Sequence, residues 1–143
     1  MESKFICPSC MVTMRLVKSE DLNHHGTLFA GRTAEWFVES GFIAAATMTK
    51  PENIVCLKIH GMTFSRPVKL GELVAFYSKI VLVGKSRLVS HIQVIANGQK
   101  VVEGFITFVH VDLQAHAIPH GLIIVPTSPE DIALMEEAKK LPL

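Results

Sequence analysis

The chain has 143 residues, of which 49% are hydrophobic and 19% charged, and its formal net charge is +1. This length fits a single domain, and the scattered lysines and arginines offer no basic patch, so we expect no nucleic-acid partner. Many hydrophobic and few charged residues favour an apolar surface that another subunit covers, and we expect a homo-oligomer.

The N-terminal segment gives no sign of export or membrane insertion. Residues 1–8 lack the apolar core of a signal peptide, and no stretch approaches the roughly 18 apolar residues that cross a bilayer. Three cysteines cannot all pair within one chain, so we expect a cytoplasmic protein in a reducing compartment. Cys7 and Cys10 form a lone C-x-x-C pair, whereas a structural zinc site ordinarily has four ligands. Only Cys56, a histidine or a second copy could complete such a site, and we predict no metal.

A strand and then a long helix are predicted next. Residues 11–17 alternate in part between apolar and polar and predict a strand. From about residue 28, apolar residues recur at three-, four- and seven-residue spacings around most of a helix, which predicts a buried one. A single charged stripe of Arg32, Glu35 and Glu39 interrupts it. This flank either meets a ligand or a partner, or is an ordinary solvated face.

The chain after Pro51 is strand-like. Alternation and β-branched content predict strands in residues 54–62, 73–83, 88–96 and 100–111, while residues 64–68 lead into a turn at 70–72. Asn97-Gly98 between the last two runs is a strong hairpin signal. The order predicts an α+β architecture in which an antiparallel sheet wraps one long helix.

A second helix is predicted near the C-terminus. Ser128 can cap it, Pro129 suits its first position, and Lys139 suits its end. We expect residues 1–143 to form one domain, with a core at about 12–113 and a helical tail at about 128–140.

The segment before the long helix is the best candidate for chemistry. It places an amide, two imidazoles and two glycines ahead of an apolar helix. A helix start presents unpaired N–H groups and the positive end of a dipole, which can stabilise an oxygen that acquires negative charge.

Residues 23–31 followed by Trp36-Phe37-Val38-Glu39 resemble the N-x-x-G-x-x-F-G-G and W-[FM]-[DE]-E pattern of hotdog-fold acyl-CoA thioesterases. Residues 64–74, 83–86 and 104–109 are similar to later parts of that pattern in the same order, so the resemblance covers about residues 12–113. It implies the hotdog fold, subunits that pair edge to edge, and active sites at the dimer interface. The implied reaction is hydrolysis of acyl-CoA, with the thioester as substrate and no cofactor.

The resemblance also implies roles for individual positions. Asn23 corresponds to the loop residue that assists catalysis, and the backbone N–H groups of Ala30 and Gly31 correspond to the oxyanion donors. For Asn23 the alternative is an ordinary turn or capping residue.

The pattern places a catalytic carboxylate at position 38, where this chain has Val38. Glu39 is the nearest carboxylate in sequence, and Glu35 lies one turn back from it. His24 has an imidazole suited to act as base near neutral pH. We rank Glu39 first as base, then His24, then Glu35.

Lys85, Ser86 and Arg87 follow Gly84 at a strand start, where similar hotdog proteins contact coenzyme A. Basic residues in a tight turn suit phosphate, and the alternative is a solvated hairpin tip. For the whole chain, the alternatives to hydrolysis are a non-catalytic acyl-CoA-binding or regulatory hotdog protein and a dehydratase-like enzyme.

Overall fold

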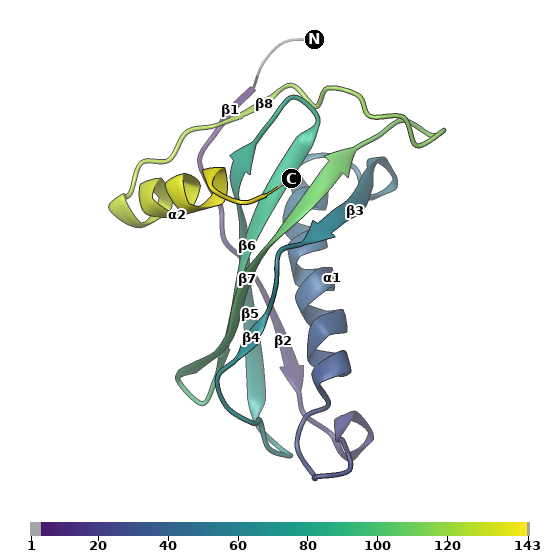
Figure 1. Cartoon of the computed structure of the whole chain (residues 1–143), viewed down its shortest axis with the longest axis vertical. Coiled ribbons are helices and arrows are strands. Elements are labelled where there is room, and N and C mark those ends of the chain that lie inside the picture. The colour runs from purple at the N-terminus through teal and green to yellow at the C-terminus, as the bar shows by residue number, and fades with distance from the viewer. Residues whose placement is uncertain (1–3, 143) are drawn as a thin grey trace.

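A six-stranded antiparallel sheet curves around one long helix, α1 (Figure 1). The computed structural model describes residues 4–142. Its elements in chain order are β1 (Lys4–Ile6), β2 (Met11–Leu16), η1 (Ser19–Asp21), α1 (Ala30–Met48), η2 (Pro51–Asn53), β3 (Ile54–Ile59), β4 (Thr63–Phe64), β5 (Leu73–Val83), β6 (Arg87–Ala96), β7 (Gln99–His110), β8 (Leu122–Ile124) and α2 (Pro129–Lys139). Within the described residues, neither helix is long and apolar enough to span a bilayer.

The strands of the main sheet follow the order β2-β5-β6-β7-β3, and β4 also pairs with β7. The edges are therefore β2 and β3. The predicted hairpin is confirmed: Asn97 and Gly98 join β6 to β7 with φ angles of 51° and 73°. Two successive residues with positive φ match the twist of antiparallel strands.

The predicted strand at residues 54–62 is shorter in the structure. β3 stops at Ile59, and Gly61 adopts a φ of 117° before β4 begins. β4 has only two residues, and Pro67 beyond it has no N–H to donate to a sheet. Both short strands lie along β7, so a bend at Gly61 divides one sheet edge into two pieces.

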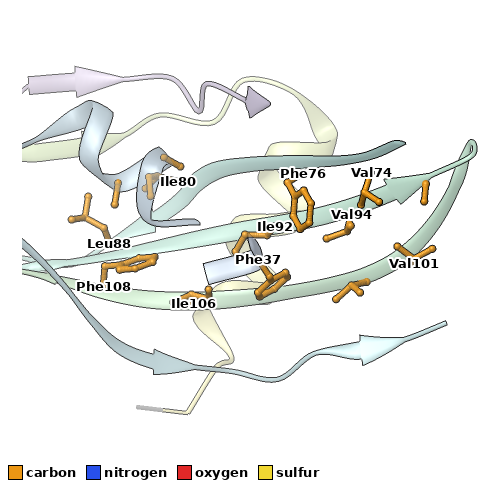
Figure 2. Close-up of a cluster of buried hydrophobic side chains, with 14 of the residues drawn as sticks. Phe37, Val74, Phe76, Ile80, Leu88, Ile92, Val94, Val101, Ile106 and Phe108 are labelled. Atoms are coloured by element: carbon orange, nitrogen blue, oxygen red, sulfur yellow. The ribbon is translucent and has the colours of Figure 1, made fainter. Parts of the chain in front are cut away.

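The core lies between α1 and the inner face of the sheet. Phe37 of α1 is fully buried among side chains from β5, β6 and β7 (Figure 2). Two buried serines of the sheet, Ser78 and Ser90, donate hydrogen bonds of 2.8 Å to backbone carbonyls of α1. A Cβ on Gly41 would lie 3.0 Å from Ile92, so a glycine here lets the helix approach the sheet closely. The predicted long buried helix is confirmed.

The predicted C-terminal helix is present as α2, and it covers part of the outer face of the sheet. Ser128 accepts a hydrogen bond from the N–H of Asp131, and Lys79 of β5 lies 2.6 Å from the Asp131 carboxylate. The sequence did not predict β1 and β8, which pair in parallel with one another. Each has three residues, which is too short for alternation to identify.

Candidate active site

Asn23 organises the loop that leads into α1. Its side-chain oxygen accepts hydrogen bonds from the N–H groups of His25 at 2.9 Å and Thr27 at 3.2 Å. Its amide nitrogen donates to the Thr27 hydroxyl at 3.2 Å. Asn23 thus holds a tight turn, and one N–H of its side chain remains for a further partner.

The start of α1 leaves its first backbone N–H groups without a capping side chain. Phe29 occupies the N-cap and provides no side-chain cap, and the first turn has no acidic residue. The N–H groups of Arg32 and Thr33 both donate to the Phe29 carbonyl. The N–H groups of Ala30 and Gly31 therefore lie at the positive end of the helix dipole.

A cavity of roughly 360 Å³ adjoins this helix start. Most of its wall is apolar, and its polar lining includes Asn23, Thr33, Ser65 and Arg66. Ala30 also lines it, so the structure brings the predicted loop asparagine and one predicted oxyanion position to one cavity. Among the described residues, the cavity lining contains no carboxylate and no histidine.

Glu39, the first-ranked base, lies on the flank of α1 that faces β2. There it forms an ion pair with Arg15, whose guanidinium lies 5.3 Å from the centre of the Trp36 ring. Val38 lies about 100° around the helix from Glu39 and packs against the main core. One turn further on, Phe42 contacts Phe108 of β7, the neighbour of β3.

The other two candidate bases also lie outside the cavity lining. Glu35 is exposed, with a carboxylate oxygen 3.4 Å from Arg32, and the same arginine lies 3.4 Å from the buried Asp21. The charged stripe is thus a set of ion pairs on one flank. The ring centroids of His24 and His25 lie 3.9 Å apart in the exposed loop, with the ring planes tilted by 42°.

Sequence reasoning missed Arg66, which lines the cavity and also bonds to the last residue of β6. Its guanidinium donates to the Ala96 carbonyl at 2.6 Å and to the Glu72 carboxylate at 3.0 Å. The hydrogen bond from Arg66 to its carboxylate, together with one from the Lys69 backbone, lowers the pKa of Glu72. The signal available in the sequence was an arginine and a glutamate on either side of a predicted turn, but their pairing depends on how the turn closes.

Lys85, Ser86 and Arg87 lie in the hairpin between β5 and β6. The end of β7 and the loop that follows it hold this hairpin. The N–H of His110, the last residue of β7, donates to the Ser86 carbonyl at 2.7 Å, and the N–H of His120 donates to the Lys85 carbonyl at 3.2 Å. The sequence left both histidines without a role. The hairpin is therefore fixed through its backbone.

The His120 ring adds two further bonds. Its Nδ1 accepts from the Leu122 N–H at 3.0 Å, so Nε2 carries the proton and donates to the Arg87 carbonyl at 3.0 Å. Burial lowers the pKa of His120, which favours the neutral ring that this arrangement requires.

The helix start and the hairpin lie at opposite ends of the sheet (Figure 1). Leu28 bonds to Val68 just before β5 begins, whereas the hairpin follows the end of β5. Ten residue steps along a strand correspond to about 33 Å. One copy thus keeps its predicted oxyanion donors far from its predicted coenzyme A contacts.

The three cysteines are free and exposed. Within residues 4–142, no three histidine, cysteine, aspartate or glutamate side chains gather as metal ligands would. That the protein needs no metal remains a prediction.

The model of the thioesterase superfamily matches residues 25–103, more than half of the chain. The chain belongs to this superfamily. This thioesterase-superfamily protein is 27% identical to an uncharacterized acyl-CoA thioester hydrolase of Bacillus subtilis, YkhA, over 96% of its own length and 82% of the relative. It is 28% identical to the Escherichia coli acyl-CoA thioester hydrolase YciA, over 71% and 83% of the two chains.

Solved structures confirm the hotdog fold of this thioesterase-superfamily protein. A hexameric acyl-CoA thioesterase superposes with a TM-score of 0.85 over 91% of this chain and 86% of its own, at 23% identity. A hexameric thioesterase from Yersinia pestis superposes with a TM-score of 0.69 over 75% and 91%, at 27% identity.

Proposed function

We propose that this protein hydrolyses acyl-CoA thioesters to a free carboxylic acid and coenzyme A. The observation that carries the proposal is the cavity at the start of α1, where Asn23 and the Ala30 backbone meet an apolar wall. An apolar cavity suits an acyl chain, and uncapped helix amides suit a carbonyl oxygen that becomes negative. The two relatives named as acyl-CoA thioester hydrolases support the substrate class.

In the proposed reaction, the thioester oxygen accepts hydrogen bonds from the N–H groups of Ala30 and Gly31. Water adds to the carbonyl carbon while the base takes its proton, and the negative charge collects on that oxygen. The carbon–sulfur bond then breaks, and the departing sulfur takes up the proton to give the thiol. Each oxyanion donor contributes about 10²- to 10³-fold to the rate. Because the side-chain oxygen of Asn23 is occupied by its own loop, its amide N–H is the group that contacts water or substrate.

The base is proposed in the order Glu39, His24, Glu35. Glu39 acts only when its ion pair with Arg15 opens, and none of the three lines the cavity of its own chain. Substitution by Gln, or by Asn for the histidine, should lower kcat by about 10²- to 10⁴-fold for the residue that is the base. Full activity in all three single variants would remove these side chains from the mechanism.

The coenzyme A moiety is proposed to bind Lys85, Ser86 and Arg87. A positively charged hairpin tip suits phosphate groups, and its backbone is held in place by the following loop. Since this hairpin lies at the far end of the sheet from the Asn23 loop, we propose that one substrate contacts two copies of the chain. A homo-oligomer is thus part of the proposed function.

The test is thiol release from a panel of acyl-CoAs, read with a chromogenic thiol reagent. Hydrolysis predicts release of one thiol for each carboxylic acid formed. A specific observation favours a second function, acyl-CoA binding without hydrolysis: position 38 is Val38, and no carboxylate among residues 4–142 lines the cavity. Saturable binding of acyl-CoA by calorimetry, without thiol release, would establish that second function and overturn the first.

A further inference from the structure

The cavity at the start of α1 has a mouth and a closed inner end. Ala30, Phe64 and Ser65 border the mouth and are exposed to solvent. The inner end is a buried apolar wall whose residues are at most 7% exposed, and they are Leu28, Val68, Val74, Val101 and Val102. All five belong to the main core of the same chain. The inner end is therefore closed by the chain itself, and a second copy can add to the lining only at the mouth.

Three valines form the deepest part of this wall, Val74 of β5 with Val101 and Val102 of β7, and are called here the valine floor. Each is at most 1% exposed. Val74 and Val101 lie at one end of the buried cluster between α1 and the sheet (Figure 2). Because such an interior is close-packed, an acyl chain that reaches the valine floor cannot pass it without displacing core side chains.

The volume of the cavity sets the length of chain that it can hold. It measures roughly 360 Å³. A group with one non-hydrogen atom occupies roughly 30 Å³ in a liquid, so the cavity holds about twelve such groups. The carbonyl carbon, its oxygen and the attacking water account for about three of them, which leaves space for about nine further carbons.

The cavity offers no free charge to a charged acyl group. Among the described residues of its lining, Arg66 alone is charged, and its guanidinium is paired with the Glu72 carboxylate at 3.0 Å. Each terminal nitrogen of Arg66 donates both to Glu72 and to a backbone carbonyl, that of Pro67 or Ala96. A carboxylate at the end of an acyl chain would therefore lose its water here without gaining a cation.

We propose that the valine floor and the neutralised Arg66 restrict the substrate to uncharged acyl groups of up to about ten carbons. The inference rests on the proposed hydrolysis of acyl-CoA. Each methylene that enters the apolar cavity should raise kcat/KM about fourfold. A longer chain must fold back or draw its carbonyl away from the helix amides, so the gain should stop at that length and then reverse.

The inference is tested with the full chain on straight saturated acyl-CoAs of two to sixteen carbons. We expect kcat/KM to rise with length and to break at about ten carbons. Val74→Ala removes two methyl groups from the valine floor and should move the break to chains about two carbons longer, whereas Val102→Leu adds one carbon and should move it about one carbon the other way.

Val81→Ala is the matched control, because Val81 lies on the same strand and is equally buried, but packs under α2 on the other face of the sheet. It should leave the break where it is, and circular dichroism confirms folding of each variant. Charge is tested with glutaryl-CoA against its uncharged isostere 5-methylhexanoyl-CoA, for which we expect kcat/KM to be higher by about 10²-fold.

A rise that continues evenly to sixteen carbons, a break that does not move in folded Val74→Ala and Val102→Leu proteins, or equal use of the two isosteres would overturn the inference and leave hydrolysis standing. A protein that releases no thiol from any acyl-CoA would overturn the proposed hydrolysis. The break is then read from Kd values, measured by calorimetry on the same acyl-CoAs and variants. Its position and its shift decide the inference in the same way.

Discussion

The two ends of the sheet differ in the groups that they offer a ligand. At the start of α1, the lining of the cavity is mainly apolar, and its polar side chains are Asn23, Thr33, Ser65 and Arg66. At the hairpin, Lys85 and Arg87 belong to a backbone that His110 and His120 hold in place. The first end suits an acyl chain and the second suits phosphate, which supports the proposal that one coenzyme A thioester contacts both ends. In a single copy they are too far apart.

The largest expected effect comes from giving the first end the carboxylate that it lacks. Val38→Asp places an acid at the position where the motif that this chain resembles has one, about 100° around α1 from Glu39 and its ion pair. We expect kcat for acyl-CoA hydrolysis to rise by about 10²- to 10⁴-fold. Val38→Asn, which has the same shape without the charge, should give no such rise. An unchanged kcat in a folded Val38→Asp variant would show that adding a carboxylate to the cavity at the start of α1 is not sufficient for faster hydrolysis.

The next effect tests whether two copies complete one site. Asn23→Ala should lower kcat by about 10²-fold, as removal of a polar group at an oxyanion site does. The double variant Lys85→Ala, Arg87→Ala should raise KM by at least about tenfold, because hydrogen bonds to charged groups contribute about 1.5–3 kcal/mol each. A short acyl thioester without the nucleotide should be hydrolysed equally well by the double variant and the unmodified protein.

The Asn23→Ala variant and the Lys85→Ala, Arg87→Ala variant should restore activity when they are dissociated, mixed and allowed to reassociate. With random pairing, half of the dimers contain one of each chain, and each of these has one site with an intact Asn23 and an intact hairpin. We expect about one quarter of the unmodified activity. Mixtures no more active than their components would show that each chain builds its own site.

The sequence predicted local features better than contacts between distant segments, and this holds at both ends. The helix, the hairpin at Asn97-Gly98 and the start of α2 at Ser128 were predicted because each depends on local periodicity or turn chemistry. The cavity beside Asn23 depends on where residues 64–68 close against β7, and no local pattern specifies that contact. Arg66 and His120 were missed for the same reason. Their partners, Ala96 and Arg87, lie about thirty residues away in the chain.

Acid should weaken the hairpin end before the helix start. The folded-state pKa of His120 is lowered by burial and by the nearby His110, so at pH values below about 6.5 the unfolded chain binds more protons than the folded one. Stability from the neutral ring is therefore complete above that pH and is lost as the pH falls through the folded-state pKa. Denaturant melts between pH 5 and 8 should show this loss.

His120→Gln serves as the comparison, since it has an amide in place of the titrating ring. We expect it to cost about 1–2 kcal/mol at pH 7.5 through imperfect replacement of two hydrogen bonds, and to have a smaller loss of stability toward pH 5. KM for acyl-CoA should rise while kcat for a short thioester stays the same. Equal pH slopes for the two proteins would assign the acid sensitivity to other groups.

The smallest expected effect concerns the ion pair between Arg15 and Glu39, midway between the two ends. Both side chains are about half exposed, so solvent screens the pair and its contribution is at most about 1 kcal/mol. Arg15→Gln should lower the unfolding free energy by no more than that, and part of the loss reflects its contact with the Trp36 ring. If Glu39 is the base, freeing it from Arg15 keeps or raises kcat, whereas Glu39→Gln abolishes most of it. Equal and small effects of both substitutions on stability, with kcat unchanged in both, would identify the pair as a structural contact between α1 and β2.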